Sequence, residues 1–371
     1  MNELQQKLKN LSTDLLRELH ENGFREAEFL AMAQTVTADP SGRNRLADGV
    51  TPPKDTDIES PVDRARFERV GREALSKGQV AFVVLAGGMA TRMGGVVKAL
   101  VPAVGTLTFL DLRLAEQANW GKRMGVSPPL WLMTSHATDA PLRKALGSRE
   151  DGRSVALFRQ NASLRLTPNK DLFVDDKGRP QIYAPGHGDL PEALRRSGLL
   201  DAFVASGGKY VWIANIDNLG AGIDPVLLGW HISHHQAVSV EVVEKIGSDK
   251  GGIPVRWRDK PMILEEFRLP LTFDPAQVRV FNTNTFIVDA EPLASYAMPF
   301  TWVQVTKHVN GREAIQFERL IGEITTHLST KFVLVPREGK ASRFLPVKSN
   351  EELEKRRDAM KILAQSRGML P

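Results

Sequence analysis

Residues 83–98 of this chain, VVLAGGMATRMGGVVK, decide its fold. The stretch begins inside an apolar run of β-type residues, 81–85, and that run stops at Ala86-Gly87-Gly88. Paired glycines after a buried strand let a negatively charged ligand approach the main chain, because no Cβ stands in the way. Arg92 and Lys98 would neutralise the charge of such a ligand. We therefore interpret the stretch as a phosphate-binding loop, with a purely structural turn as the alternative.

Two common phosphate loops do not fit these residues. Five residues separate Gly88 from Gly94 and no Gly-Lys-Ser/Thr follows, which excludes a Walker A loop. No G-x-G-x-x-G can be placed on the stretch, which excludes the dinucleotide fingerprint. The stretch instead resembles the L-x-G-G-x-G-T-R-x-G…P-K signature of nucleotidyltransferases that join a nucleoside triphosphate to a sugar 1-phosphate. Ala90 and Val97 depart from that signature, and a Cβ at position 90 would crowd the triphosphate if the backbone there needed a positive φ.

The composition is that of an ordinary globular protein, with 371 residues of which 42% are hydrophobic and 25% charged. The absence of cysteine excludes disulfides, zinc–thiolate sites and thiol catalysis, and suits a cytoplasmic location. The N-terminus lacks the apolar core of a signal peptide, and no apolar run reaches the roughly 18 residues of a membrane span. The net charge of +5 is modest, and a phosphate-rich small ligand explains it as well as nucleic acid would. We expect neither a nucleic acid nor a membrane as partner.

The order of the expected elements predicts an α/β fold. Leucines at three- and four-residue spacing predict a helix over residues 1–35, and residues 50–61 are interpreted as a surface connection before a helix over 63–76. Expected strands then alternate with expected helices: strands at 81–85, 130–134, 155–158, 210–214 and 238–243, helices at 109–124, 139–146 and 190–206. A capping-box spacing at 349–352 starts a terminal helix through about residue 365.

This alternation predicts a mostly parallel sheet covered by helices on both sides. Ligands of such sheets bind beyond the carboxyl ends of the strands. The candidate residues obey that rule: Gly87-Gly88, Thr134-Ser135 and residues 215–218 each follow an expected strand. We expect an N-terminal helical segment over 1–75, a catalytic domain over 76–335 and a short C-terminal segment over 336–371.

Several polar clusters are candidates for binding chemistry. In 184–189, APGHGD, Gly186 lets a flat base or sugar approach the backbone and His187 donates to a phosphate or hydroxyl, unless the loop is simply a solvent-facing turn. Asp217 in 215–218, NIDN, is placed to hold Mg²⁺, which prefers oxygen ligands, although Asp and Asn also end strands because they favour turns.

Further clusters stand later in the chain. In 281–284, FNTN, the amides suit sugar hydroxyls, and the carboxylates of 264–266, LEE, could accept from the same hydroxyls; either group could equally be solvated surface. Residues 343–348, RFLPVK, bring two cations near an apolar turn. The histidines of 231–235, HISHH, are better explained by a helix surface than by a metal.

Taken in order, nine motifs resemble those of the UTP–glucose-1-phosphate uridylyltransferase family. They are LAGGMATRMG…K, MTS, Gln160, PGHGD, NIDN, the glycines at 251–252, LEE, FNTN and RFLPVK, and they cover about residues 80–348. The resemblance implies a three-layer Rossmann-like nucleotide-diphospho-sugar transferase fold with a mixed, mostly parallel sheet, an N-terminal helical extension and a C-terminal helix. The family has related enzymes for UDP-N-acetylhexosamines, but GHGD and FNTN look more like the glucose 1-phosphate enzymes.

The resemblance also implies roles for individual residues. Carried over position by position, Lys98, Arg92 and Lys348 are catalytic cations; Leu85, Gly87, Gly88, Gln160 and Gly186 bind the nucleotide; His187, Glu265, Asn282 and Asn284 bind the sugar phosphate; and Asp217 holds Mg²⁺.

The implied reaction is Mg²⁺-dependent transfer from UTP to glucose 1-phosphate, giving UDP-glucose and pyrophosphate. Because the attacking phosphate oxygen is already anionic, catalysis needs positioning and charge neutralisation rather than a strong base. Two alternatives remain open: the same reaction with another sugar 1-phosphate, N-acetylglucosamine or galactose, and a non-catalytic nucleotide-sugar sensor. Only 23 residues follow Lys348, too few for the β-helical domain of the eukaryotic enzymes, so we expect a monomer.

Overall fold

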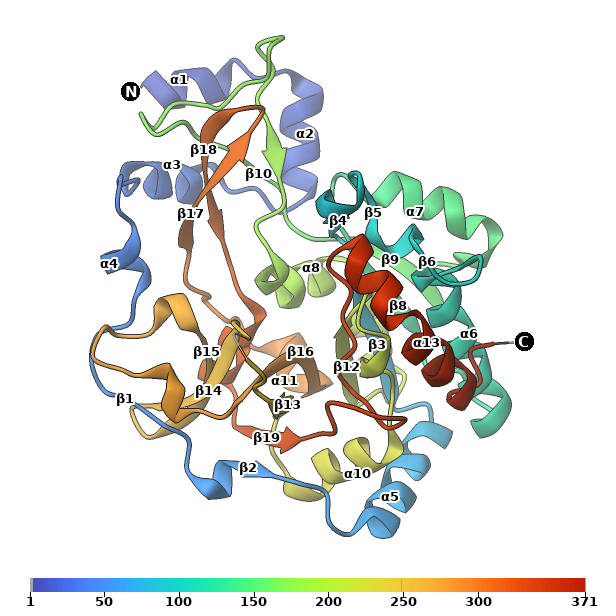
Figure 1. Ribbon diagram of the computed structural model, residues 1–371. Helices are drawn as coiled ribbons and strands as arrows, with labels where there is room; N and C mark the ends of the chain where they lie inside the picture. Colours follow the sequence, from blue (N-terminus) through green and yellow to red (C-terminus); the bar gives the residue numbers. More distant parts are fainter. Residues whose placement is uncertain (1–2, 248, 371) are drawn as a thin grey trace.

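A computed structural model describes residues 3–247 and 249–370 of the chain (Figure 1). Its centre is an eight-stranded sheet in which adjacent strands follow the order β2-β19-β13-β16-β12-β3-β8-β9. These strands are β2 (Ile58–Glu59), β19 (Thr330–Leu334), β13 (Val238–Glu244), β16 (Val280–Asp289), β12 (Tyr210–Asn215), β3 (Val80–Leu85), β8 (Leu130–Thr134) and β9 (Val155–Arg159). Strand β16 runs antiparallel to its neighbours β13 and β12, and every other pair in this sheet is parallel. The predicted mixed, mostly parallel sheet is confirmed.

Helices cover both faces of the sheet. On β3, Phe82 stacks under the guanidinium of Arg113 from α6 (Phe109–Met124). On β8, Trp131 meets Phe203 of α9 (Leu199–Ala205) edge to face at 5.5 Å. Because Trp131 is in register with Val83, the neighbour of Phe82, these two aromatic side chains point to opposite faces.

The other helices complete the two layers. Helix α5 (Arg64–Ser76) packs closely on α10 (Pro225–His234), since a Cβ on Gly71 or Gly229 would overlap the backbone of the facing helix. Helices α8 (Leu190–Arg196) and α11 (Ala290–Ser295) lie beside α9, and α7 (Asp139–Leu146) lies beside β9. Near its start, the terminal helix α13 (Asn350–Ser366) carries its predicted cap, because Ser349 Oγ accepts from Glu352 N. In a complete capping box the Glu352 side chain would accept from the backbone N–H of Ser349. Here Glu352 Oε2 accepts from the backbone N–H of Lys348 instead.

A second lobe, at the top of Figure 1, is built around its own apolar core. The predicted continuous helix over 1–35 is wrong within the described residues: the chain forms α1 (Glu3–Lys9), α2 (Thr13–Glu21) and α3 (Glu26–Gln34), and residues 1–2 lie outside the described part. Ser12 caps α2 and Gly23, at φ 75°, separates α2 from α3. These helices pack on β10 (Ser163–Leu164), β11 (Ile182–Tyr183) and β18 (Arg312–Glu318), and β17 (Val303–Val309) pairs with β18.

One further expectation is corrected and another is refined. Residues 50–61 are more than a surface connection, because β2 forms the edge of the main sheet and β1 (Val50–Thr51) pairs with β14 (Gly252–Trp257), which in turn pairs with β15 (Lys260–Glu265). Residues 190–206 are largely helical, as predicted, but they form two helices, because Gly198, at φ 75°, ends α8 before α9 begins. The remaining short elements are α4 (Ser41–Asn44), α12 (Ile324–His327), β4 (Met89–Ala90), β5 (Val96–Val97), β6 (Pro102–Val104) and β7 (Leu107–Thr108).

Candidate active site

The loop after β3 lies where the carboxyl ends of the parallel strands meet. Leu85, the last residue of β3, accepts from the backbone of Ile216 just past β12, at 3.2 Å. The carbonyl of Gly87 accepts from Ser135 Oγ at 2.8 Å, which joins the ends of β3 and β8. The space where a Cβ of Gly88 would lie is open, so a ligand can approach this backbone closely.

Gln160 stands against the same loop. Its backbone N–H donates to Thr134 O at the end of β8, and a Cβ added to Gly87 would lie 2.4 Å from its Nε2. The residue is 7% exposed, yet its side-chain amide makes no hydrogen bond within residues 3–247 and 249–370. A buried amide whose donor and acceptor are both free can form hydrogen bonds with the polar edge of a ligand.

Lys98 and Asp217 meet across the loop. Lys98 N donates to Gly88 O at 3.2 Å, which folds the loop back on itself, and Lys98 Nζ donates to Asp217 Oδ2 at 2.9 Å. The Asp217 side chain is 8% exposed and the Lys98 side chain 20%, so the pair is only partly screened by water. The predicted catalytic cation and the predicted metal ligand are therefore direct partners.

The two predicted sugar-binding asparagines, Asn282 and Asn284, belong to β16. Residues 281–284, FNTN, lie inside β16, near its first residue. Because β16 is antiparallel, its start lies at the edge where β12 ends. There Asn284 Nδ2 donates to Asn215 Oδ1 at 2.9 Å, and Asn284 N donates to Asn282 Oδ1 at 2.8 Å. Asn284 has φ 59°, a left-handed conformation that asparagine tolerates better than most residues.

The Gly-His-Gly loop is held by a segment far away in the chain. Gly186, at φ 104°, lies so close to residue 319 that an added Cβ would be 2.7 Å from the carbonyl oxygen of Arg319. The Arg319 guanidinium donates to the buried carboxylate of Asp189, with Nε to Oδ1 at 2.8 Å. Ile321 N donates to His187 Nδ1 at 2.9 Å.

This contact fixes the chemistry of His187. Burial lowers the pKa of His187 to about 4, and the field of Glu318 offsets only part of that effect. The imidazole is thus neutral at pH 7. Since Nδ1 accepts from Ile321, the ring proton resides on Nε2, which remains a hydrogen-bond donor for a ligand.

Glu265 and Lys348 lie at the other side of the same segment. Gly322, next to Ile321, packs on Ile263 of β15, and β15 ends at Glu265. Burial, followed by the charge of Glu266, raises the pKa of Glu265, whereas the positive charge of Lys348 acts in the opposite direction. Lys348 is exposed; against the effect of burial, the pKa of Asp249 is lowered chiefly by its hydrogen bond with Arg337, and Lys348 adds a smaller contribution.

Arg92 is a predicted site residue that no contact among the described residues joins to the others. It is exposed and has no hydrogen bond or ion pair among the described residues. The two residues of this loop that depart from the family signature fit the backbone. Ala90 is buried at φ −79°, and Val97 is buried at φ −64°. The backbone at Ala90 is not in the positive-φ region where a Cβ causes strain.

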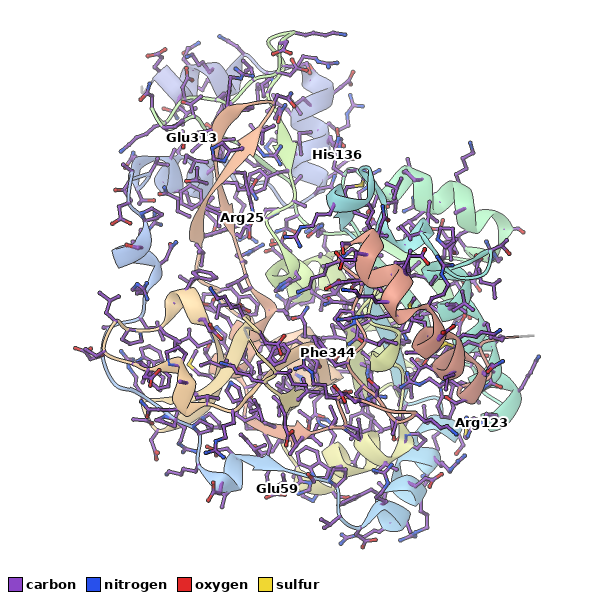
Figure 2. All side chains as sticks on the ribbon, viewed as in Figure 1. Arg25, Glu59, Arg123, His136, Glu313 and Phe344 are labelled. Carbon is purple, nitrogen blue, oxygen red and sulfur yellow. The ribbon has the colours of Figure 1, made fainter. Side chains whose placement is uncertain are left out.

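The two cations of the RFLPVK motif, Arg343 and Lys348, lie in different environments. Arg343 is 3% exposed and pairs with Glu241 of β13, with Nε to Oε2 at 2.9 Å and Nη2 to Oε1 at 2.5 Å. Phe344 packs edge-on to Phe281 of β16 at 5.1 Å and lies near the middle of the molecule (Figure 2). Of these cations, Lys348 alone is exposed.

The histidines of 231–235 also differ from a simple helix surface. His231 is 1% exposed, with Nδ1 at 2.7 Å from Ser239 Oγ and Nε2 at 3.1 Å from Asp289 Oδ1, so it joins α10 to β13 and β16. His234 contacts Glu59 of β2 through Nε2 at 3.1 Å. These partners explain both histidines as structural side chains.

Three contributors were not among the predicted site residues. Ser135 and Asn215 bind Gly87 and Asn284, and both belong to motifs, MTS and NIDN, that pointed to them. No sequence pattern pointed to Arg319 as part of the site, because its partner Asp189 lies 130 positions away in the sequence. Pairing at that distance depends on tertiary structure alone.

The donor set around Asp217 fits a magnesium ion bound together with a phosphate ligand. Asp217 Oδ2 accepts from Lys98, and Oδ1 has no hydrogen-bond partner within the described residues. These residues contain no group of three or more His, Cys, Asp or Glu side chains with metal-binding geometry. Mg²⁺ commonly binds through one or two carboxylates, with waters and substrate phosphates completing its shell.

The sheet order, the glycine loop at the end of β3 and the polar edge formed by β12 and β16 define an α/β protein with the fold of the nucleotide-sugar pyrophosphorylases. A UDP-glucose phosphorylase from Trypanosoma brucei superposes with a TM-score of 0.77 at 23% identity, covering 92% of this chain and 77% of that one. The uridine diphosphate N-acetylglucosamine pyrophosphorylase from the same organism gives 0.73 at 20% identity, covering 97% and 81%. At these identities the likeness concerns the fold alone.

The chain belongs to the UTP–glucose-1-phosphate uridylyltransferase family, whose model matches residues 27–365. A relative of that name from Astragalus penduliflorus is 30% identical over 285 residues, 72% of this chain and 60% of the relative. One from Dictyostelium discoideum is 28% identical over 367 residues, 94% of this chain and 72% of the relative. The chain thus spans about 60% of the length of several curated relatives that it matches. None of the helices within 3–247 and 249–370 has the length and apolar character needed to cross a membrane.

Proposed function

We propose that this chain catalyses uridylyl transfer from UTP to glucose 1-phosphate, giving UDP-glucose and pyrophosphate. A phosphate oxygen of glucose 1-phosphate attacks the α-phosphorus of UTP; the new P–O bond forms as the bond from that phosphorus to the bridging oxygen breaks. The electron pair leaves with pyrophosphate. The observation that carries the proposal is the 2.9 Å pair of Lys98 and Asp217 beside the open backbone of Gly88.

The residues at this edge have complementary tasks in the proposed reaction. The free amide of Gln160 and the backbone at Gly87 and Gly186 would bind the uracil and ribose. Lys98, with Arg92 and Lys348, would neutralise the charge that moves from the α-phosphorus to the leaving group. Mg²⁺ held by Asp217 would supply further positive charge and orient the phosphates.

The sugar phosphate would lie between the asparagines of β16 and the Gly-His-Gly loop. The neutral His187 would donate from Nε2 to a phosphate oxygen, and Asn282, Asn284 and Glu265 would bind hexose hydroxyls. Burial raises the pKa of Glu265, and its carboxyl oxygens would accept from a hexose hydroxyl. The relatives named as uridylyltransferases support glucose 1-phosphate as the acceptor.

The test is pyrophosphate release by purified protein supplied with Mg²⁺, UTP and a panel of sugar 1-phosphates. Rapid release with glucose 1-phosphate alone is the expected result. Release with N-acetylglucosamine or galactose 1-phosphate instead would keep the chemistry and contradict the substrate. Protein that binds UTP or UDP-glucose but releases no pyrophosphate with any sugar would be a nucleotide-sugar sensor, and the proposed activity would be wrong.

A further inference from the structure

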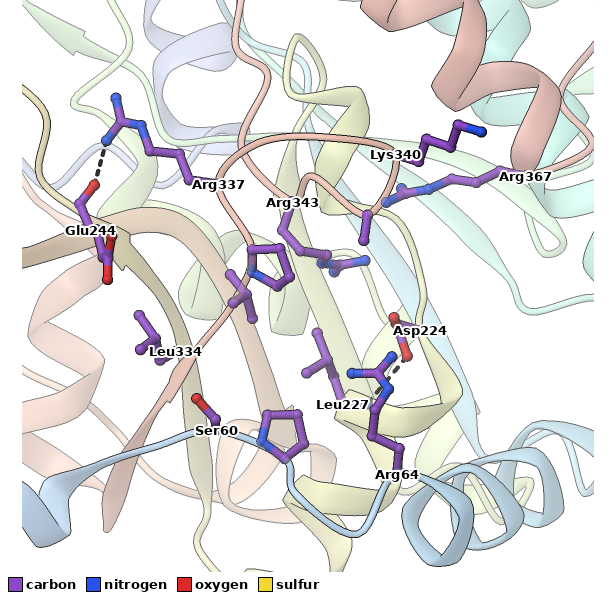
Figure 3. Close-up of a pocket in the computed structure, with 14 residues that line it drawn as sticks. Ser60, Arg64, Asp224, Leu227, Glu244, Leu334, Arg337, Lys340, Arg343 and Arg367 are labelled. Carbon is purple, nitrogen blue, oxygen red and sulfur yellow. Dashed lines mark hydrogen bonds between the residues drawn. The ribbon is translucent and has the colours of Figure 1, made fainter.

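A cavity of about 600 Å³ lies beside the loop that follows β19, and it contains none of the predicted site residues (Figure 3). Of its fourteen lining residues, five carry a positive charge and two a negative charge. The positive residues are Arg64, Arg337, Lys340, Arg343 and Arg367. Such an excess of arginine and lysine around one cavity favours an anionic ligand.

Three of the guanidinium groups come from distant parts of the chain. Arg64 is the first residue of α5, Arg343 belongs to the loop before α13, and Arg367 follows the last turn of α13. Figure 3 shows the Arg64 side chain rising toward Asp224 while Arg343 and Arg367 extend toward one another. Burial and then the charge of Arg343 lower the pKa of Arg367 to about 10, as expected for neighbouring cations.

The donors of this cavity are only partly used by the protein. Arg343 gives Nε and Nη2 to Glu241, but its Nη1 has no partner among the described residues although Arg343 is 3% exposed. Arg64 and Lys340 make no hydrogen bond or ion pair within the same described part. Arg337 points out of the cavity, where Nη1 donates to Glu244 O at 2.6 Å (Figure 3).

The negative charge of Asp224 acts on Arg343 and Arg367, but Asp224 makes no hydrogen bond with a cation of the cavity among the described residues. The Asp224 carboxylate is the N-cap of α10 and accepts from the backbone of Val226 at 2.8 Å and of Leu227 at 3.4 Å. Arg367 donates to the carbonyls of Leu219 at 2.8 Å and Gly220 at 2.7 Å. The unused donors are therefore Arg343 Nη1 and the whole head groups of Arg64 and Lys340.

We propose that this cavity binds a phosphate group, either free or carried by a small organic molecule. Guanidinium groups match phosphate oxygens in geometry as well as charge, and Arg343 is held in place by its buried pair with Glu241. Pro61, Leu227 and Pro336 give the cavity an apolar wall, and its volume is in the range of about 300–1,000 Å³ of small-molecule sites. The site lies outside the proposed active site and has its own ligand.

One loop is shared by the cavity and the proposed active site. Asn218, which follows Asp217, donates through Nδ2 to Arg343 O at 3.1 Å and accepts from Leu345 N at 2.8 Å. Three residues further along, the same loop reaches Lys348. Phosphate could also bind at Lys98, so the experiment has to separate the two positions.

The test is isothermal titration of inorganic phosphate into the full chain at constant ionic strength. The cavity variant is the double substitution Arg64→Gln with Lys340→Gln; both side chains are exposed, so the fold is retained. The control is Arg66→Gln, an exposed arginine on the same helix that does not line the cavity. Lys98→Ala removes the cation of the proposed active site.

We expect the cavity variant to bind phosphate at least about tenfold more weakly than the wild type, because charge-assisted hydrogen bonds are lost. Arg66→Gln should bind as the wild type does, and Lys98→Ala should retain the phosphate binding that the cavity variant loses. A second titration with a hexose 6-phosphate distinguishes the two possible ligands. If the hexose 6-phosphate binds more tightly than inorganic phosphate, the ligand is a phosphate carried by a small organic molecule; if the two bind equally, the ligand is free phosphate. Absence of phosphate binding to the wild type, or loss of it in Lys98→Ala with retention in the cavity variant, would overturn the proposal.

Discussion

The ammonium of Lys98 lies 2.9 Å from the carboxylate of Asp217, and the two residues are 119 positions apart in the sequence. In the proposed reaction Lys98 would exchange this partner for the triphosphate, while Asp217 would turn to the metal. Lys98→Ala should therefore lower the rate of pyrophosphate release by orders of magnitude, since one preorganised charge contact is typically worth about 10²–10³ in rate.

The measurement pairs initial rates with circular dichroism and thermal unfolding. Lys122→Ala, which removes an exposed lysine of α6, is the control and should keep both rate and stability. A Lys98→Ala protein that keeps nearly the wild-type rate would show that the charge of Lys98 is not used in catalysis.

Asp217→Asn tests the metal site with little change in shape. The amide oxygen of asparagine can still accept from Lys98, but its neutral group binds Mg²⁺ more weakly than a carboxylate does. We expect the Mg²⁺ concentration for half-maximal rate to rise about tenfold or more, in line with the loss of a ligand charge. Asp201→Asn, an exposed carboxylate on α9, should leave the metal dependence unchanged. An unaltered Mg²⁺ titration in Asp217→Asn would exclude Asp217 as a ligand.

Substitution by alanine should have different effects at Gly87 and at Gly88. A Cβ at Gly88 meets nothing within 4 Å, so Gly88→Ala should unfold like the wild type while the KM for UTP rises, because the methyl group occupies the ligand's approach. A Cβ at Gly87 would lie 2.4 Å from Gln160 Nε2, so Gly87→Ala should displace that amide.

The measurement for this pair is UTP and ATP kinetics beside thermal unfolding. Gly87→Ala should reduce the preference for UTP over ATP, whereas Gly88→Ala should weaken both nucleotides alike. An unchanged preference in Gly87→Ala would argue against Gln160 as a contact to the base.

His187 should give stability a pH dependence. Its pKa is about 4 in the folded chain and about 6.5 when unfolded, so the unfolded state takes up the proton first as the pH falls. This contribution is complete above about pH 6.5 and is lost progressively down to pH 4, by at most about 3 kcal/mol because the residue is partly exposed.

Chemical denaturation between pH 4 and 7.5 measures this slope. His187→Asn, whose side-chain oxygen can still accept from Ile321 N, should flatten it, and His308→Asn, at an exposed position, should not. Equal slopes in the wild type and His187→Asn would mean that His187 titrates normally in the folded chain.

Asn284 combines a backbone role and a side-chain role that two substitutions separate. At φ 59°, alanine should cost about 1 kcal/mol of unfolding free energy relative to glycine. Both Asn284→Ala and Asn284→Gly remove the bond to Asn215, so both should raise the KM for the sugar 1-phosphate. Denaturation midpoints and sugar-phosphate kinetics distinguish the effects; a normal KM in Asn284→Gly would remove Asn284 from the sugar site.

Much of the main sheet followed from local patterns. The apolar runs at 130–134 and 155–158 and the periodic helices at 109–124 and 139–146 lie where the sequence predicted, because each is encoded by neighbouring residues. Strands β16 and β19 of the main sheet were not among the expected strands, and neither were β2, β14, β15, β17 and β18. Although β14 pairs with β15 and β17 with β18 as local hairpins, their sequences interrupt the apolar residues with charged residues or proline, so no continuous apolar run marks them. The helix over 1–35 failed because Ser12 and Gly23 stop it despite the leucine spacing.

The sequence by itself determined that a buried strand ends in Gly87-Gly88, that amides and a carboxylate follow β12, and that the chain resembles one family through nine ordered motifs. Tertiary structure decided how the cations are used. Lys98 meets Asp217, Arg343 is buried against Glu241, and Arg92 has no partner among the described residues, although all three stand in similar motif positions. The reason is physical: a charge is paired or free according to what the fold brings within about 4 Å, and these partners lie more than a hundred residues away in sequence.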